Sequence, residues 1–107
     1  MELNYSETGD GIRLIKLSGR LDIIGTGEIE TKFAGHCAGD NIRVLVDLSE
    51  VSFLASIGIR LFVLTAKSLA ARGGRMVLLN PTADVKNVLE LTGISAIIPM
   101  YDSLESA

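Results

Sequence analysis

The stretch that decides the fold is Asp47-Leu48-Ser49-Glu50-Val51-Ser52-Phe53-Leu54-Ala55-Ser56-Ile57-Gly58-Ile59-Arg60. It joins an apolar run, residues 42–48, to the longest helix-like run of the chain, residues 56–72. The first run is short and almost uninterrupted, which is typical of a strand buried on both faces of a mostly parallel sheet. Ser56 stands where the helix should begin, so its hydroxyl either caps the helix or is a site for reversible chemistry.

Strand-like and helix-like runs alternate on both sides of this stretch. The expected strands are residues 3–7, 12–18, 42–48, 75–79 and 94–100, and the expected helices are residues 27–37, 56–72 and about 80–93. Asp10-Gly11 predicts a tight turn between the first two strands, because both residues tolerate positive φ. The order β-β-α-β-α-β-α-β predicts an α/β fold, with a mixed, mostly parallel sheet of about five strands packed by three to four helices.

Length and composition favour one domain, residues 1–107, with a tail from about residue 102 that is frayed or forms a short terminal helix. The net charge is −3 and the ten basic residues are scattered, which argues against nucleic-acid binding. Cys37 is the only cysteine and His36 the only histidine, so neither an internal disulfide nor a metal site is expected. Without a signal peptide or a run of about 20 apolar residues, we expect a cytoplasmic protein with no membrane insertion.

The predicted central helix is apolar around most of its circumference. The face expected to pack on the sheet carries Gly58, Ile59, Phe62, Ala66, Leu69 and Ala70. A second face carries Ser56, Arg60, Val63, Lys67 and Ala71, and a third strip carries Ile57, Leu61 and Leu64. One sheet contact does not need that much apolar surface. A neighbouring helix, the C-terminal tail or a partner protein is therefore expected to cover the third strip.

Phosphorylation of Ser56 would act by simple electrostatics. A phosphate adds a charge of roughly −1.5 to −2, and a helix N-terminus stabilises an anion by about 0.3–1 kcal/mol. Arg60, one turn later, is within reach of such a group. The fold would survive, while a small neutral surface would become anionic and oppose an apolar partner.

Other polar and apolar residues leave two interpretations each. Asp22 and Asp47 are either paired carboxylates or acceptors for turn amides. Ile23 and Ile24, in an expected loop, are either core plugs or an exposed docking edge. There is no Gly-x-Ser-x-Gly elbow and no phosphate-binding loop with a lysine, so the sequence contains no catalytic constellation and we expect no enzyme.

A family resemblance is carried by five segments in this order: Gly19-Arg20-Leu21-Asp22, residues 47–59, Gly73-Gly74, Asn80-Pro81 and Leu91-Thr92-Gly93-Ile94. From about residue 2 to residue 100 the chain resembles a stand-alone STAS domain, the fold of bacterial anti-sigma factor antagonists. Two positions depart from the family pattern. Ala55 replaces the usual acidic residue before the phosphorylated serine, and Ile57 replaces the usual Ser or Thr after it.

The resemblance implies a partner switch that regulates transcription. The unphosphorylated domain binds an anti-sigma factor that is also a serine kinase of the histidine-kinase-like ATPase type. Phosphorylation at the position of Ser56 abolishes binding, and a PP2C-type phosphatase reverses it. The family's acidic residue near the phosphosite matches Asp22. No cofactor is implied.

The expected partner-binding residues are Asp22, Ile23, Ile24, Leu54, Ala55, Ser56, Ile57, Arg60, Val63, Leu64 and Lys67. The alternative is a non-switching STAS subunit of a transporter or signalling scaffold. In that case the third strip of the central helix would be a permanent interface.

Overall fold

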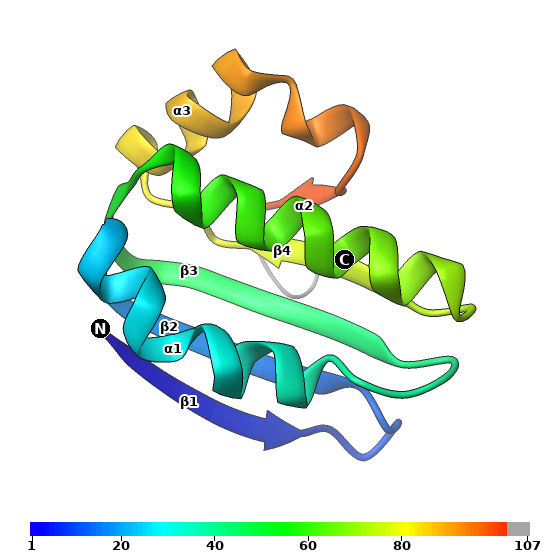
Figure 1. Cartoon of the computed structure of the whole chain (residues 1–107). Coiled ribbons are helices and arrows are strands. Elements are labelled where there is room, and N and C mark those ends of the chain that lie inside the picture. Colours follow the sequence, from blue (N-terminus) through cyan, green and yellow to red (C-terminus); the bar gives the residue numbers. More distant parts are fainter. Residues whose placement is uncertain (103–107) are drawn as a thin grey trace.

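The computed structural model describes residues 1–102 and has a single sheet flanked by helices (Figure 1). The strands are β1 (Glu2–Glu7), β2 (Arg13–Leu21), β3 (Arg43–Leu54), β4 (Arg75–Leu79) and β5 (Met100–Tyr101). The helices are α1 (Ile23–His36), α2 (Ser56–Ala71), α3 (Ala83–Thr92) and the 3-10 turn η1 (Ile94–Ala96). The predicted order of elements is confirmed. The predicted tail beyond residue 102 lies outside the described residues.

The sheet runs in the order β1-β2-β3-β4-β5. β1 pairs with β2 antiparallel, and the other neighbouring strands pair parallel. The turn between β1 and β2 uses Gly11 at φ 78°, a conformation that glycine adopts without strain. The predicted mixed, mostly parallel sheet is thus confirmed.

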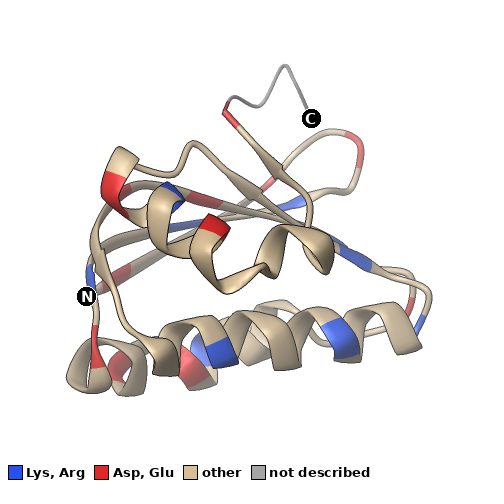
Figure 2. Cartoon of the chain, turned by 90° about the horizontal axis from the view of Figure 1, so that it is seen from above, with Lys and Arg blue, Asp and Glu red and all other residues tan. Residues whose placement is uncertain are grey.

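The main core lies between the sheet and the helices. Figure 2 shows α1 and α2 as one layer on one side of the strands, with charges of both signs scattered over the chain. The rings of Phe33 in α1 and Phe62 in α2, both fully buried, lie 5.7 Å apart at the centre of this layer. A smaller apolar cluster, with Leu45 and Val77, lies on the opposite face of the sheet. The expectation that β3 is buried on both faces is confirmed.

Two boundaries differ from the prediction. α1 begins at Ile23 rather than near residue 27, because the Asp22 side chain caps it by accepting a hydrogen bond from the amide of Gly25 (2.7 Å). β3 continues to Leu54 rather than ending near residue 48, pairing with β2 through two register shifts. The opening stretch is therefore mostly strand, and α2 follows it after one residue.

The predicted strand at 94–100 is wrong over most of its length. After Gly93 (φ 74°) the chain turns into η1, where the amides of Ile97 and Ile98 donate to the carbonyl of Ile94, each at 2.8 Å. Ile94 and Ile98 are buried while Ile97 is exposed, which is a helical spacing rather than an alternating one. In this part of the chain, only the two residues of β5 pair with the sheet, through β4.

Two glycines bring the first turns of α1 and α2 onto the end of β2. A Cβ at position 25 would collide with the carbonyl oxygen of Arg20. A Cβ at position 58 would lie 2.8 Å from Leu54 Cδ1 and 3.1 Å from Leu21 Cβ. Glycine at both positions allows the first turns to pack this closely. Both helices start at the same end of the molecule (Figure 1).

Substituting Gly58 tests this close approach. We expect Gly58→Ala to lower the free energy of unfolding by about 1–3 kcal/mol, because the new methyl group overpacks the contact with Leu54 and Leu21. Gly27→Ala is the matched control, since nothing lies within 4 Å of its added Cβ in α1. The control should raise stability by about 0.4–1 kcal/mol. Urea denaturation measures both, and equal stability of the two variants would contradict the packing described.

Candidate functional site

Ser56 is the first residue of α2 and its side chain does not cap the helix. The N-cap is Ala55, in extended backbone (φ −96°, ψ 168°), and no side chain makes a cap hydrogen bond. The carbonyl of Ala55 accepts from the amides of Gly58 (3.0 Å) and Ile59 (3.2 Å). The capping interpretation of Ser56 is therefore wrong, and its exposed hydroxyl has no hydrogen-bond partner among residues 1–102.

The N-terminus of α2 lacks the groups that usually neutralise it. Its first turn contains no acidic residue. Within residues 1–102, the amides of Ser56 and Ile57 have no hydrogen-bond acceptor. Arg60 is exposed one turn later and forms no ion pair with the described residues. The Ser56 hydroxyl thus lies at the positive end of the helix dipole, one turn before an exposed arginine.

Asp22 lies beside this site because β2 and β3 end together. Leu21 pairs with Leu54, and the amide of Ala55 donates to the carbonyl of Leu21 at 2.9 Å. The hydrogen bond from the amide of Gly25 is the main cause that lowers the pKa of Asp22, and Arg20 lowers it further. Asp22 is therefore a fixed carboxylate at neutral pH.

The two aspartates weighed in the sequence are not a carboxylate pair. Asp22 accepts from the amide of Gly25, and Asp47 Oδ1 accepts from the amide of Ser49 at 2.9 Å. Asp22 follows the end of β2, whereas Asp47 lies within β3. Each satisfies backbone amides, as turn aspartates commonly do.

Arg20 and Phe53 also belong to this end of the sheet and were missed by the sequence interpretation. They are cross-strand partners, and the Arg20 guanidinium lies 4.3 Å from the centre of the half-exposed Phe53 ring. Arg20 Nε also lies 3.5 Å from Asp22 Oδ2. A cation–π contact thus holds an arginine next to the cap of α1. Recognising it from sequence would have required the extension of β3 and its shifted register.

Large aliphatic side chains are exposed around Ser56. Ile23 and Ile24, in the first turn of α1, are 75% and 76% exposed. The core-plug interpretation of these two residues is wrong, and they form an exposed apolar edge. Ile57, next to Ser56, is also partly exposed. Because α1 and α2 start at the same end of the sheet (Figure 1), these exposed residues lie on the same end of the molecule as Ser56.

Not every predicted partner-binding residue is accessible. Leu54 is only 4% exposed, because it packs beneath Gly58, so its side chain offers almost no surface to a partner. Val63 is half-buried against the core, while Lys67 is exposed. Ala70, expected to face the sheet, is also exposed.

α1 covers part of the third strip of α2. Leu61 is half-buried and packs against the core, as a neighbouring helix would require. A hollow between α1 and α2 is lined by Thr26 and Glu30 on one side and by Ile57, Arg60, Leu61 and Leu64 on the other. Leu64 remains 56% exposed at its edge. The third strip is therefore half-buried at Leu61 and exposed at its two ends, Ile57 and Leu64.

Residues 1–102 offer little support for a metal site, a reactive thiol or a membrane-spanning helix. No three His, Cys, Asp or Glu side chains in this range come together as metal ligands. Burial raises the pKa of the Cys37 thiol to about 12, so it stays protonated and unreactive at neutral pH. Across the same range, every helix is too short or too polar to cross a bilayer.

Comparisons with known proteins identify the family. Residues 6–107 match the STAS domain. The chain is 30% identical over 98 residues to the protein named "Putative anti-sigma factor antagonist BtrV" of Bordetella bronchiseptica, covering 92% of this chain and 84% of that protein. It is 26% identical over 106 residues to the anti-sigma-B factor antagonist of Staphylococcus aureus, covering 98% of each.

The solved structures agree on the fold. A STAS domain protein of Planctomyces limnophilus, described as an anti-sigma-factor antagonist, superimposes with a TM-score of 0.86. That alignment covers 97% of this chain and 92% of the other at 22% identity, a level that speaks for the fold alone. Together with the match over nearly the whole sequence, these similarities show that the chain belongs to the STAS domain family.

Proposed function

We propose that this chain is an anti-sigma factor antagonist that works by partner switching. In its unphosphorylated form it binds an anti-sigma factor that is also a serine kinase, through the surface around Ser56. The kinase transfers the γ-phosphoryl group of ATP to Ser56 Oγ, whose proton is lost, and the complex separates. The observation that carries the proposal is the uncommitted Ser56 hydroxyl at an uncapped helix N-terminus, among exposed isoleucines. The names of the related proteins support the same function.

A phosphate on Ser56 would be compatible with the fold. Its oxygens can accept hydrogen bonds from the amides of Ser56 and Ile57, which have no other acceptor in residues 1–102. The helix N-terminus contributes about 0.3–1 kcal/mol at an exposed position, and Arg60 adds a cation nearby. No acidic residue in the first turn repels the new charge. Phosphorylation is therefore expected to change the surface and leave the fold intact.

The same phosphate would oppose docking. A partner that covers Ile23, Ile24 and Ile57 also covers Ser56, and would remove water from the phosphate. Removing an ion from water costs several kcal/mol, whereas a tenfold loss of affinity needs only about 1.4 kcal/mol. A single charge is thus sufficient to release the partner.

The partners follow from this chemistry. The kinase would be of the histidine-kinase-like ATPase type, and a PP2C-type phosphatase would remove the phosphate from the exposed Ser56. Because Ala55 supplies no carboxylate next to the serine, Asp22 is the acidic group that both enzymes would meet, fixed by Gly25 and Arg20.

A second candidate function is a non-switching subunit of a transporter or signalling scaffold. The exposure of Leu64, away from the start of α2, favours it, because a permanent partner would cover that side chain. This candidate requires no phosphate on Ser56, so one experiment separates the two.

Phosphorylation should occur at one defined residue. Incubation with ATP and the cognate kinase should add a single phosphate to the intact mass of the wild-type chain and none to Ser56→Ala. Ser52→Ala is a matched control, since Ser52 is also exposed but lies in β3. It should be phosphorylated like the wild type. An unmodified wild-type mass would exclude the switch and favour the scaffold function.

The apolar edge of α1 should contribute to partner binding. We expect Ile24→Glu to weaken binding of the unphosphorylated chain to its kinase by more than about tenfold, because the carboxylate must be desolvated. Leu91→Glu is the control, because Leu91 is 80% exposed and lies on a different helix, α3. Isothermal titration calorimetry should find the control unchanged. If both variants bind like the wild type, the partner contacts a different surface.

A further inference from the structure

The face of the sheet opposite the helices carries an ordered pattern of side chains. Successive side chains of a strand point to opposite faces, so Val44 faces the helices while Arg43 and Leu45 face away. Arg43 pairs directly with Arg75 of β4, and Leu45 pairs with Val77. Two arginines on adjacent strands are thus followed by a row of aliphatic side chains.

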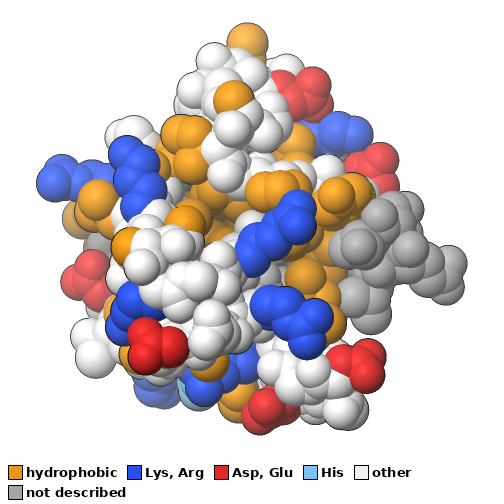
Figure 3. Space-filling model, turned by 90° about the vertical axis from the view of Figure 1, so that its right-hand side faces the viewer, with side chains coloured by type: hydrophobic (Ala, Val, Ile, Leu, Met, Phe, Trp, Pro, Cys, Tyr) orange, Lys and Arg blue, Asp and Glu red, His pale blue; other side chains and the backbone are white. Residues whose placement is uncertain are grey.

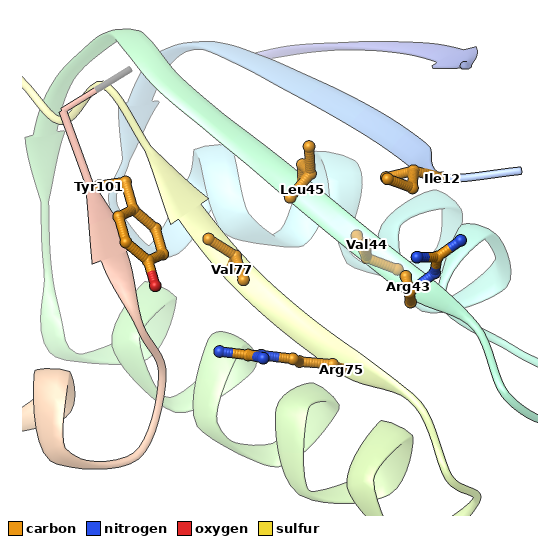
Figure 4. A pocket seen from close by; sticks show the side chains of 7 residues that line it. All are labelled: Ile12, Arg43, Val44, Leu45, Arg75, Val77 and Tyr101. Atoms are coloured by element: carbon orange, nitrogen blue, oxygen red, sulfur yellow. The ribbon is translucent and has the colours of Figure 1, made fainter. Parts of the chain in front are cut away.

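These residues line a hollow of about 220 Å³. Leu45 and Val77, both buried, form its floor, and Ile12 and Tyr101 stand at its two sides (Figure 4). Figure 3, which views the end of the molecule where β3 and β4 begin, shows basic side chains lying among hydrophobic ones. The hollow therefore combines an apolar floor with a cationic rim.

Among the residues that the structure describes, neither of the two guanidinium groups is paired with a carboxylate. None of the ion pairs within residues 1–102 includes Arg43 or Arg75. Arg43 donates to the carbonyl of Asp10 at 3.0 Å. In Figure 4 Arg43 turns toward Ile12 and Arg75 toward the side of Tyr101, so the like charges diverge. Because Arg43 already donates to the carbonyl of Asp10, Arg75 is the guanidinium that is available to an anion in the hollow.

The dimensions and chemistry of the hollow select a ligand class. Its volume is below the roughly 300 Å³ at which pockets for drug-sized ligands begin. Guanidinium groups bind carboxylates with paired hydrogen bonds, and the Leu45–Val77 floor favours a short hydrocarbon body. We propose that this hollow binds a small organic carboxylate with an apolar body. The site lies at the start of β3, whereas Ser56 follows the end of β3, so the proposal is independent of the partner switch.

A titration of the ¹⁵N-labelled full chain with hexanoate tests the proposal. We expect saturable amide shifts at Leu45, Val77 and Tyr101, and none at Ser56. Acetate, which has the charge without the hydrocarbon, and 1-hexanol, which has the hydrocarbon without the charge, should each bind at least about tenfold more weakly. Equal shifts with acetate or with hexanol would overturn the proposal, as would no shift with hexanoate.

Arginine variants test whether Arg75 binds the carboxylate of hexanoate. Arg75→Gln should weaken hexanoate binding by at least about tenfold, with an otherwise unchanged amide spectrum because Arg75 is exposed. Arg72→Gln is the matched control, since that guanidinium lies at the end of α2 and donates to Ser68. Equal losses in the two variants would mean general charge attraction and overturn the site. Shifts at Leu45 and Val77 that depend on protein concentration alone would show a second copy of the chain on this face, which also contradicts the proposal.

Discussion

The packing of the first turn of α2 against the end of β2 is the constraint on which the rest of the site depends. The amide of Ala55 is hydrogen-bonded to the carbonyl of Leu21, and Gly58 leaves no room for a Cβ between α2 and Leu54. This contact makes Ala55 the N-cap and pushes Ser56 to the outside. It also sets the start of α2 beside the start of α1. The exposed Ser56 therefore lies at the start of α2, on the same end of the molecule as the exposed isoleucines at the start of α1 and the Asp22 carboxylate that caps α1.

The two helices that start at this end are capped differently, and the difference has a functional meaning. α1 is capped by Asp22, whose carboxylate is committed to the amide of Gly25 and lies near Arg20. α2 has no side-chain cap and no acidic residue in its first turn. The N-terminus of α1 thus already has a negative charge beside it, whereas the N-terminus of α2 has none among the described residues. In our account the phosphate on Ser56 supplies it, at little cost to the fold and at a large cost to the partner complex.

The sequence predicted the order of elements and the place of Ser56 at the start of the central helix, because buried strands and the amphipathic helix leave periodic patterns. It did not predict where β3 ends, since Ser49, Glu50 and Ser52 interrupt the apolar pattern. Glu50 pairs with Ser18 of β2, whereas Ser49 and Ser52 fall at the two register shifts. The burial of Leu54 follows from that extension. The run from Ile94 to Ile98 suggested a strand, but the left-handed backbone of Gly93 is followed by the 3-10 turn η1 instead. The contact between Arg20 and Phe53 depends on a shifted register, which no single-sequence pattern records.

The central claim is that one phosphate on Ser56 separates the chain from its anti-sigma partner without unfolding it. The most direct measurement is the calorimetric affinity of one preparation for that partner, taken before phosphorylation, after complete phosphorylation and after dephosphorylation. The thermal unfolding midpoint is recorded at each stage. The account predicts that affinity falls by at least about tenfold and then recovers, while the midpoint stays nearly constant. An affinity that phosphorylation leaves unchanged, or a loss of binding that merely follows unfolding, would contradict it.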